Sequence, residues 1–169
     1  MRARTRIKSK NNIPKAIATA DKFHNRRIRV GYFGEGFPQM LAHIHEFGCD
    51  IPVTDKMRGF FRFQFGISLK KTTTVIRIPE RSFIRAGWDQ HGPDILDKYK
   101  RLIGEAILNG VAPEALLSAL ALESQGKLQE FARDLRDPAN VALTIEQKGS
   151  SNPLVDSGNM IGSMDHKIE

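Results

Sequence analysis

The sequence predicts an α+β fold in which an antiparallel helix hairpin packs on one side of a small, mainly antiparallel sheet. Short runs of strand type lie on either side of the expected helices, at 27–33, 73–78 and 166–168. Two stretches after residue 92 repeat apolar residues at helical spacing. The 169 residues are enough for one domain with a core and too few for two large ones.

The chain divides into a flexible basic N-terminal arm with a short helix, at 1–24, and a single α+β domain at 25–169. Residues 1–30 hold ten Lys or Arg and one acidic residue, a net charge of +9, whereas the remaining residues carry −2. This local excess could bind a phosphate backbone, lie on an acidic face of a neighbouring subunit, or be solvated by water. The basic residues nearest the start are Arg2, Arg4, Arg6, Lys8 and Lys10.

Three elements are expected in the first fifty residues. Residues 13–23 have Pro14 in a first helical turn and apolar residues near helical spacing. Residues 27–33 alternate apolar and charged side chains, which is typical of a strand with one face in water. A second helix follows at about 39–47, and Gly48 is an architectural residue that ends it because glycine accepts a positive φ.

No stretch of the sequence has the pattern of a catalytic, metal or cofactor site. The glycines of the turn at 31–36 follow neither the phosphate-loop nor the dinucleotide-binding order. His43 and His45 would point to different sides of a helix, and no second His or Cys cluster accompanies them. The single cysteine, Cys49, excludes an internal disulfide and fits a reducing cytoplasm. We therefore expect a protein that is not an enzyme and uses no cofactor.

Residues 49–72 are expected to form an aromatic-rich insertion. Four phenylalanines within six residues are unusual for a surface loop, because exposed apolar area forgoes about 25 cal/mol per Å². They occupy neighbouring as well as alternate positions, so they follow one face of neither a helix nor a strand. We interpret them as a subunit contact, with burial in the core as the alternative. They are Phe60, Phe61, Phe63 and Phe65.

The middle of the chain is a corner between a strand and a helix. Residues 73–78 alternate as a strand does, and Pro79 ends it because proline cannot donate to a sheet. Ser82 stands where its side chain could accept from the first free amides of a helix, and Phe83 supplies apolar bulk to bury. Two guanidinium groups flank this corner and suit binding to carboxylates within or between subunits: Arg81 and Arg85.

The second half of the sequence is mainly helical. Helices are expected from Gly92-Pro93 to Gly110 and from Pro113 to about Arg136, and their short connection predicts an antiparallel hairpin. A short helix is expected at 140–148, and 166–168 is expected to close the sheet. The turn before the last short helix contains Asp156 and Gly158, and its buried face would consist of Met160, Ile161 and Met164.

Three motifs, taken in order, resemble those of one protein family. The stretch Ile-Pro-Glu-Arg-Ser-Phe-Ile-Arg at 78–85 resembles an Ile-Pro-x-Arg-Pro/Ser-Phe-Leu/Ile-Arg signature. His-Glu-Phe-Gly at 45–48 and Asn-Pro-Leu-Val-Asp-Ser-Gly at 152–158 are similar to two further family motifs. The family is that of the virion morphogenesis, or tail-completion, proteins of Mu-like and other long-tailed bacteriophages. Ser82 and Ser157 replace the family's Pro and Thr, which leaves the resemblance intact.

The resemblance implies a structural virion protein at the neck or the head-proximal end of the tail. Such a protein acts in tail completion and head–tail joining as part of a ring, which we expect to contain six copies. Its expected partners are the head connector or adaptor, the tail terminator and the tail tube, with packaged DNA as a further contact of the basic arm. The resemblance also implies assembly in the host cytoplasm.

Two alternatives stay open. The protein could be a tail terminator, because termination and completion of a tail require similar surfaces. It could also be a basic nucleic-acid-binding accessory protein, which the charge of the arm would explain. No apolar run approaches the roughly 18 residues that a membrane span requires, so no membrane partner is expected.

Overall fold

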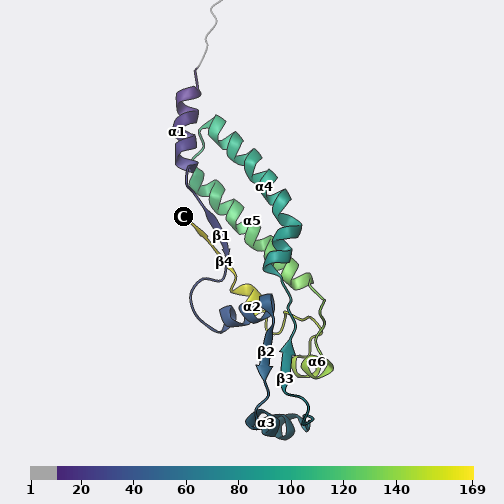
Figure 1. The fold of residues 1–169 in the computed structure, drawn as a ribbon. Helices are drawn as coiled ribbons and strands as arrows, with labels where there is room; N and C mark the ends of the chain where they lie inside the picture. Colours follow the sequence, from purple (N-terminus) through teal and green to yellow (C-terminus); the bar gives the residue numbers. More distant parts are fainter. Residues whose placement is uncertain (1–10) are drawn as a thin grey trace, which may run out of the picture.

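The structure, a computed structural model, describes residues 11–169, so the predictions for Arg2, Arg4, Arg6, Lys8 and Lys10 lie outside the described residues. The described chain has seven helices and four strands in small antiparallel sheets, which confirms the α+β class. Figure 1 shows an elongated arrangement with α1 (Ile13–Phe23) near one end and α3 (Asp55–Phe65) at the other. Within these residues, no helix is long and apolar enough to cross a membrane.

The expected single sheet is instead two separate two-stranded ribbons. β1 (Ile28–Gly31) pairs with β4 (Asp165–Ile168), and β2 (Cys49–Pro52) pairs with β3 (Val75–Ile78), both antiparallel. The helix α2 (Phe37–Phe47) lies between the two ribbons along the chain and in Figure 1. The β2–β3 ribbon extends away from the α4–α5 hairpin and carries α3 at its far end (Figure 1).

The predicted helix hairpin is present, but its first helix begins earlier than expected. α4 (Ile84–Asn109) and α5 (Pro113–Asp134) lie side by side in Figure 1, connected by a short turn at Gly110. Helix α4 continues through Gly92 and Pro93, where the sequence suggested its start. Gly92 lies beneath the Trp88 indole, since a Cβ at Gly92 would come within 2.9 Å of that ring. The glycine therefore serves packing within the helix and does not mark its end.

The core lies where the hairpin meets the C-terminal segment. Phe83 is fully buried there, and α7 (Asn159–Gly162) contributes the predicted apolar face to the same cluster. Gly87 allows α4 to approach α5 closely, because a Cβ would lie 3.0 Å from Leu128. The buried members of the cluster are Ala42, Phe83, Leu128, Ala132, Leu154, Met160, Ile161 and Met164.

Two shorter helices complete the fold. α1 has the bounds predicted from the sequence and packs beside the end of α4, where the Lys15 ammonium donates to the Asn109 carbonyl at 3.3 Å. α6 (Ala142–Lys148) lies within the stretch expected to be helical. The helical part of the N-terminal region is therefore in contact with the domain.

Gly48 is required by both its conformation and its surroundings. It ends α2 with φ +73°, and a Cβ at this position would lie 3.0 Å from both the Glu80 nitrogen and the Ile78 oxygen. We expect Gly48→Ala to lower the free energy of unfolding by about 2 kcal/mol, because the strained φ and the backbone clash add together. Denaturant unfolding followed by circular dichroism measures this loss.

Gly126 provides the matched control for that substitution. It lies exposed in α5 with open space around its Cα. Gly126→Ala should raise stability by roughly 0.5–1 kcal/mol, because alanine is the better helix former. Equal effects of the two substitutions would contradict the role assigned to Gly48.

Candidate protein-interaction site

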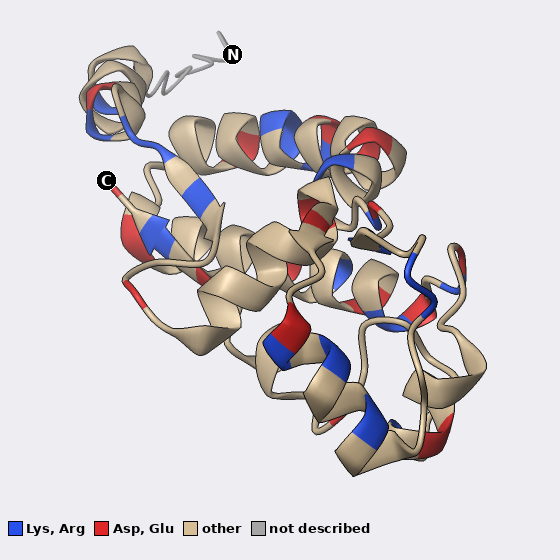
Figure 2. Cartoon of the chain, turned by 60° about the horizontal axis from the view of Figure 1, so that its bottom comes forward, with Lys and Arg blue, Asp and Glu red and all other residues tan. Residues whose placement is uncertain are grey.

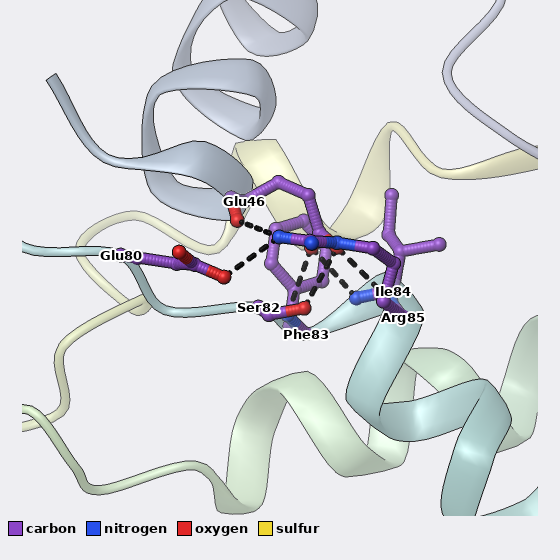
Figure 3. A network of polar contacts seen from close by, with 6 residues as sticks. All are labelled: Glu46, Glu80, Ser82, Phe83, Ile84 and Arg85. Atoms are coloured by element: carbon purple, nitrogen blue, oxygen red, sulfur yellow. Dashed lines mark hydrogen bonds and ion pairs between the residues drawn. The ribbon is translucent and has the colours of Figure 1, made fainter.

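A buried carboxylate connects α2 to the start of α4. The Glu46 side chain, in the last turn of α2, is 4% exposed. Its Oε2 accepts from the amides of Phe83 at 2.8 Å and Ile84 at 2.9 Å, and its Oε1 accepts from the Arg85 amide at 3.0 Å (Figure 3). Free amides and the helix dipole favour a negative charge at this position. Glu46 therefore caps α4 from another helix, and we call Glu46 together with residues 82–85 the Glu46 joint.

The side chains around this carboxylate hold it ionised. The Arg85 guanidinium donates through Nε to Glu46 Oε1 at 3.0 Å and through Nη2 to Glu80 Oε1 at 2.7 Å. Burial alone would raise the pKa of Glu46, but hydrogen bonds from the Ile84 and Arg85 amides and from the Arg85 and Ser82 side chains outweigh it. The net pKa of Glu46 lies below its ordinary value, as expected for a charge-assisted cap.

Ser82 has a different role from the one predicted. We expected its side chain to accept from helix amides, but its hydroxyl donates to Glu46 Oε1 at 2.9 Å. The cap oxygens come from Glu46, a residue of the His-Glu-Phe-Gly motif for which the sequence predicted no such role. Two features of the sequence could have indicated this cap. The motif at 45–48 contains an acidic residue, and the helix that starts in the motif at 78–85 has no acidic residue in its own first turn.

Arg81 makes its contacts inside the chain. It is 5% exposed, and its guanidinium donates to the Pro138 carbonyl at 2.7 Å, to the Ala139 carbonyl at 3.2 Å and to Asn140 Oδ1 at 3.2 Å. Asn140 in turn donates to the Asn152 carbonyl at 3.3 Å. Arg81 and Arg85 were expected to bind carboxylates, either within the chain or on a neighbouring subunit. Both make contacts within the chain, and the partners of Arg81 are carbonyl and amide oxygens.

These bonds bring the three motifs of the resemblance together. The His45 carbonyl accepts from the Arg81 amide at 2.7 Å, so the first and second motifs are adjacent. Asn140 bridges Arg81 to Asn152 in the third motif, and Leu154 packs in the same cluster as Phe83. Gly158 precedes α7 with φ +82°, while Asp156 is exposed. The three motifs are thus connected to one another and form one structural unit, which includes the Glu46 joint.

His45 gives this joint a dependence on pH. Its Nδ1 lies 3.4 Å from Arg81 Nη1, and burial together with the charges of Arg81 and Lys148 lowers the pKa of His45 to about 4. Since the unfolded chain binds this proton near pH 6.5, stability falls as the pH drops from 6.5 towards 4. The ring keeps some contact with water, so we expect His45 to account for a loss of about 1 kcal/mol between pH 7 and pH 5.

The control keeps the acceptor and removes the titration. In His45→Asn, the amide oxygen can replace Nδ1 opposite Arg81, and unfolding curves between pH 7 and pH 5 should show a smaller loss than those of the wild type. The same pH dependence in both proteins would show that another group titrates.

The β2–β3 ribbon extends from this joint and ends in α3. Thr54 caps α3 through its hydroxyl, which accepts from the Met57 amide at 3.2 Å, and Gly66 ends the helix at φ +66°. The Arg58 side chain donates to the Leu69, Lys70 and Thr73 carbonyls at 2.7–3.2 Å. These bonds fix α3 against the returning loop, and we call residues 54–73 the α3 tip.

The four phenylalanines lie on this helix, and none is buried in the core. No residue of α3 is buried, Phe63 is 91% exposed and Phe60 is 55% exposed. The rings of Phe60, Phe61 and Phe65 contact one another edge to face at 5.6–6.1 Å between centroids. Burial in the core, the alternative we kept for this stretch, is therefore wrong, and the stretch forms a helix, which the spacing of its phenylalanines did not indicate.

The α3 tip is also basic. Residues 54–73 hold five Lys or Arg and one acidic residue, a net charge of +4. Figure 2 shows the positive segments along α3 after its single acidic residue near the start. Exposed aromatic rings and arginine side chains are enriched at protein interfaces.

Neither a metal site nor a known relative gives this surface a function. In residues 11–169, no group of three or more His, Cys, Asp or Glu is placed to hold a metal ion. Comparisons of the chain with protein-family models, curated proteins and solved structures gave no significant match. The features of the chain that bear on its function are therefore the surface itself and the motifs.

Proposed function

We propose that this protein is a structural component of a long-tailed bacteriophage, at the neck or the head-proximal end of the tail. It acts in tail completion and head–tail joining as part of a ring, and it is assembled in the host cytoplasm. The observation that carries this proposal is the α3 tip, an exposed, aromatic and basic helix at the end of a ribbon. Exposed apolar area of this kind lowers solubility unless a partner covers it.

The three motifs support the same proposal. They are the residues through which the chain resembles virion morphogenesis proteins, and they form the joint that holds the β2–β3 ribbon on the helices. A rigid joint suits a protein whose task is to present one surface at a fixed angle. Arg81 and Arg85 contribute through this joint, and α3 contributes the contact.

Rotational symmetry explains how such a small surface can be effective. Each copy in a ring makes the same contact with the next, so modest contacts add up around the ring. In this proposal the ring has six copies and contacts the tail terminator or the head connector. The basic N-terminal region then faces an acidic neighbouring ring or packaged DNA.

A deletion experiment tests this proposal. Phage lacking the gene should produce filled heads and separate tails that do not join, visible by electron microscopy of the lysate. Supplying the wild-type gene in trans should restore joined particles. Joined, infectious particles at normal yield without the gene would contradict the proposal.

A nucleic-acid-binding role is the second candidate. The described part of the N-terminal region continues the positive charge of the arm, and Arg27 and Arg29 are exposed, although Arg29 also pairs with Glu169 at 3.1 Å. Retention on DNA that falls steeply with salt and disappears when residues 1–12 are deleted would favour this role. DNA retention without assembly defects in the deletion phage would decide for it.

A further inference from the structure

The helix α2 exposes an apolar face to the solvent. On its inner side Ala42 is buried, and the helix packs on α7. On the opposite side Phe37 is 67% exposed, Met40 49% and Phe47 54%, and Ile44 lies half-buried between them. Residues three and four apart share one face of a helix, so these four side chains form a continuous row. We call Phe37, Met40, Ile44 and Phe47 the α2 stripe.

The α2 stripe carries no charge of its own. Residues 36–45 contain no Lys, Arg, Asp or Glu, and Glu46 is buried in the joint. The nearest charged groups lie at the two ends of the stripe, where Glu35 precedes the helix and Arg85 pairs with Glu80 at 2.7 Å. Apolar area left in water forgoes about 25 cal/mol per Å². A partner that covers the stripe is therefore selected by apolar shape and not by charge.

The spacing of the α2 stripe is the same in both directions along the helix. Its members lie three, four and three residues apart. A half turn about the middle of the stripe exchanges Phe37 with Phe47 and Met40 with Ile44. Two antiparallel copies of the helix thus place every apolar side chain of one against an apolar side chain of the other, with their dipoles opposed. The stripe is self-complementary, which is the property that a two-fold contact requires.

A hollow beside Phe47 has room for an aromatic side chain of a second copy. It has a volume of about 260 Å³, and Tyr32, His43 and Arg85 are among the residues that line it. The His43 ring lies 4.8 Å from the Phe47 ring between centroids, and the Arg85 guanidinium lies 4.8 Å above the same ring. These contacts hold Phe47 as one wall of the hollow. A cavity of about 150 Å³ accepts benzene, so the hollow can accept the ring of Phe37.

We propose that two copies of the chain, outside the assembled particle, pair through the α2 stripe about a two-fold axis with their α2 helices antiparallel. Phe37 of each copy lies against Phe47 of the other at the hollow, and Met40 lies against Ile44 at the centre. The contact is closed by symmetry, so it gives a dimer and cannot by itself build a ring. The inference goes beyond the proposed function, because α3 lies at the far end of the β2–β3 ribbon and takes no part in the contact (Figure 1).

The size of the stripe sets the strength of the dimer. A phenylalanine side chain offers about 150–250 Å². The exposed parts of the stripe therefore bury a few hundred Å² in each copy, less than the roughly 800 Å² per partner of a standard interface. We expect a dissociation constant on the order of 10 μM, so the chain is a monomer when dilute and a dimer when concentrated.

Sedimentation equilibrium of the full chain tests the dimer. Met40→Asp should weaken the association by about 30-fold or more, because it places a carboxylate on each side of the axis in an apolar contact. Leu122→Asp is the matched control, since Leu122 is a similarly exposed apolar residue on α5, and it should leave the association unchanged. Circular dichroism spectra like that of the wild type would show that both variants fold. Equal weakening by the two variants would overturn the inference, and so would a wild type that stays monomeric at about twenty times the expected dissociation constant.

Cross-linking of single-cysteine variants gives the orientation of the two helices. The variants are made in the full chain with Cys49→Ser and treated with a short bis-maleimide at high protein concentration. Met40→Cys lies near the axis and should form a covalent dimer alone. Phe37→Cys and Phe47→Cys should cross-link when they are mixed and hardly at all when separate. A dimer from Phe37→Cys alone would indicate parallel helices and overturn the inference.

The outcomes separate this inference from the proposed function. A wild-type chain that is monomeric in solution overturns the α2 dimer and leaves the ring in the particle in place. Joined particles at normal yield from the deletion phage would contradict the proposed function, whatever the sedimentation shows.

Discussion

Replacing Glu46 by alanine is expected to lower the free energy of unfolding by about 4 kcal/mol. The substitution removes the acceptor of five hydrogen bonds and leaves the Phe83 amide buried without a partner. It also removes the negative charge at the start of α4, where the helix dipole favours it. Denaturant unfolding of the purified chain measures the loss.

Glu80 offers the matched control. It binds the same guanidinium as Glu46 but is exposed, so Glu80→Ala should change stability little. Glu46→Gln keeps one acceptor oxygen and should fall between the two. A loss below about 1 kcal/mol in Glu46→Ala would contradict the structural role of the Glu46 joint.

Arg81→Ala is expected to cost about 3 kcal/mol of stability in the isolated chain. The guanidinium is buried and donates to three oxygens from residues 138–140, which would lose their donors. Arg81→Lys should restore little of this loss, because an ammonium cannot reproduce the planar fork. Thermal and denaturant unfolding check both substitutions.

The control for Arg81 is another arginine that pairs at the surface. Arg77 binds Asp50 through two bonds of 2.8 and 2.9 Å, but both side chains are exposed, and Arg77→Ala should be nearly neutral. If Arg81→Ala folded as stably as the wild type but no longer assembled, the internal role of Arg81 would be wrong and a contact between subunits would replace it.

Local signals in the sequence predicted much of the fold. The proline of the first turn and the apolar spacing located α1, and alternation followed by Pro79 located β3. The short connection at Gly110 predicted the hairpin. Each of these features depends on residues close together in the sequence, where turn and helix propensities act directly.

Contacts over long distances in sequence explain what the prediction missed. The cap at the start of α4 comes from Glu46, some forty residues earlier, whereas the local pattern around residue 84 had suggested Ser82. The division of the strands into two ribbons also depends on distant segments, because β1 pairs with β4 from the other end of the described chain. The α3 helix, in contrast, did have local signals, because Thr54 and Gly66 are residues typical of helix ends, although the spacing of its phenylalanines indicated no helix.

The exposure of the α3 phenylalanines was predicted more successfully than the internal contacts of Arg81 and Arg85. The unusual density of phenylalanines indicated a subunit contact; the structure places Phe60 and Phe63 at the surface, and the contact itself stays a prediction. The sequence could not show whether Arg81 and Arg85 bind groups of their own chain or of a neighbouring subunit. An arginine that binds backbone carbonyls has the same sequence pattern as one that binds a neighbour. Only the fold shows which carbonyls lie within reach.

The number of copies of this chain in purified phage particles tests the central claim most directly. Quantitative mass spectrometry against an isotope-labelled standard should find the chain in mature particles at about six copies each, as a single ring requires. Absence of the chain from particles that are otherwise complete would contradict a structural role at the neck or tail.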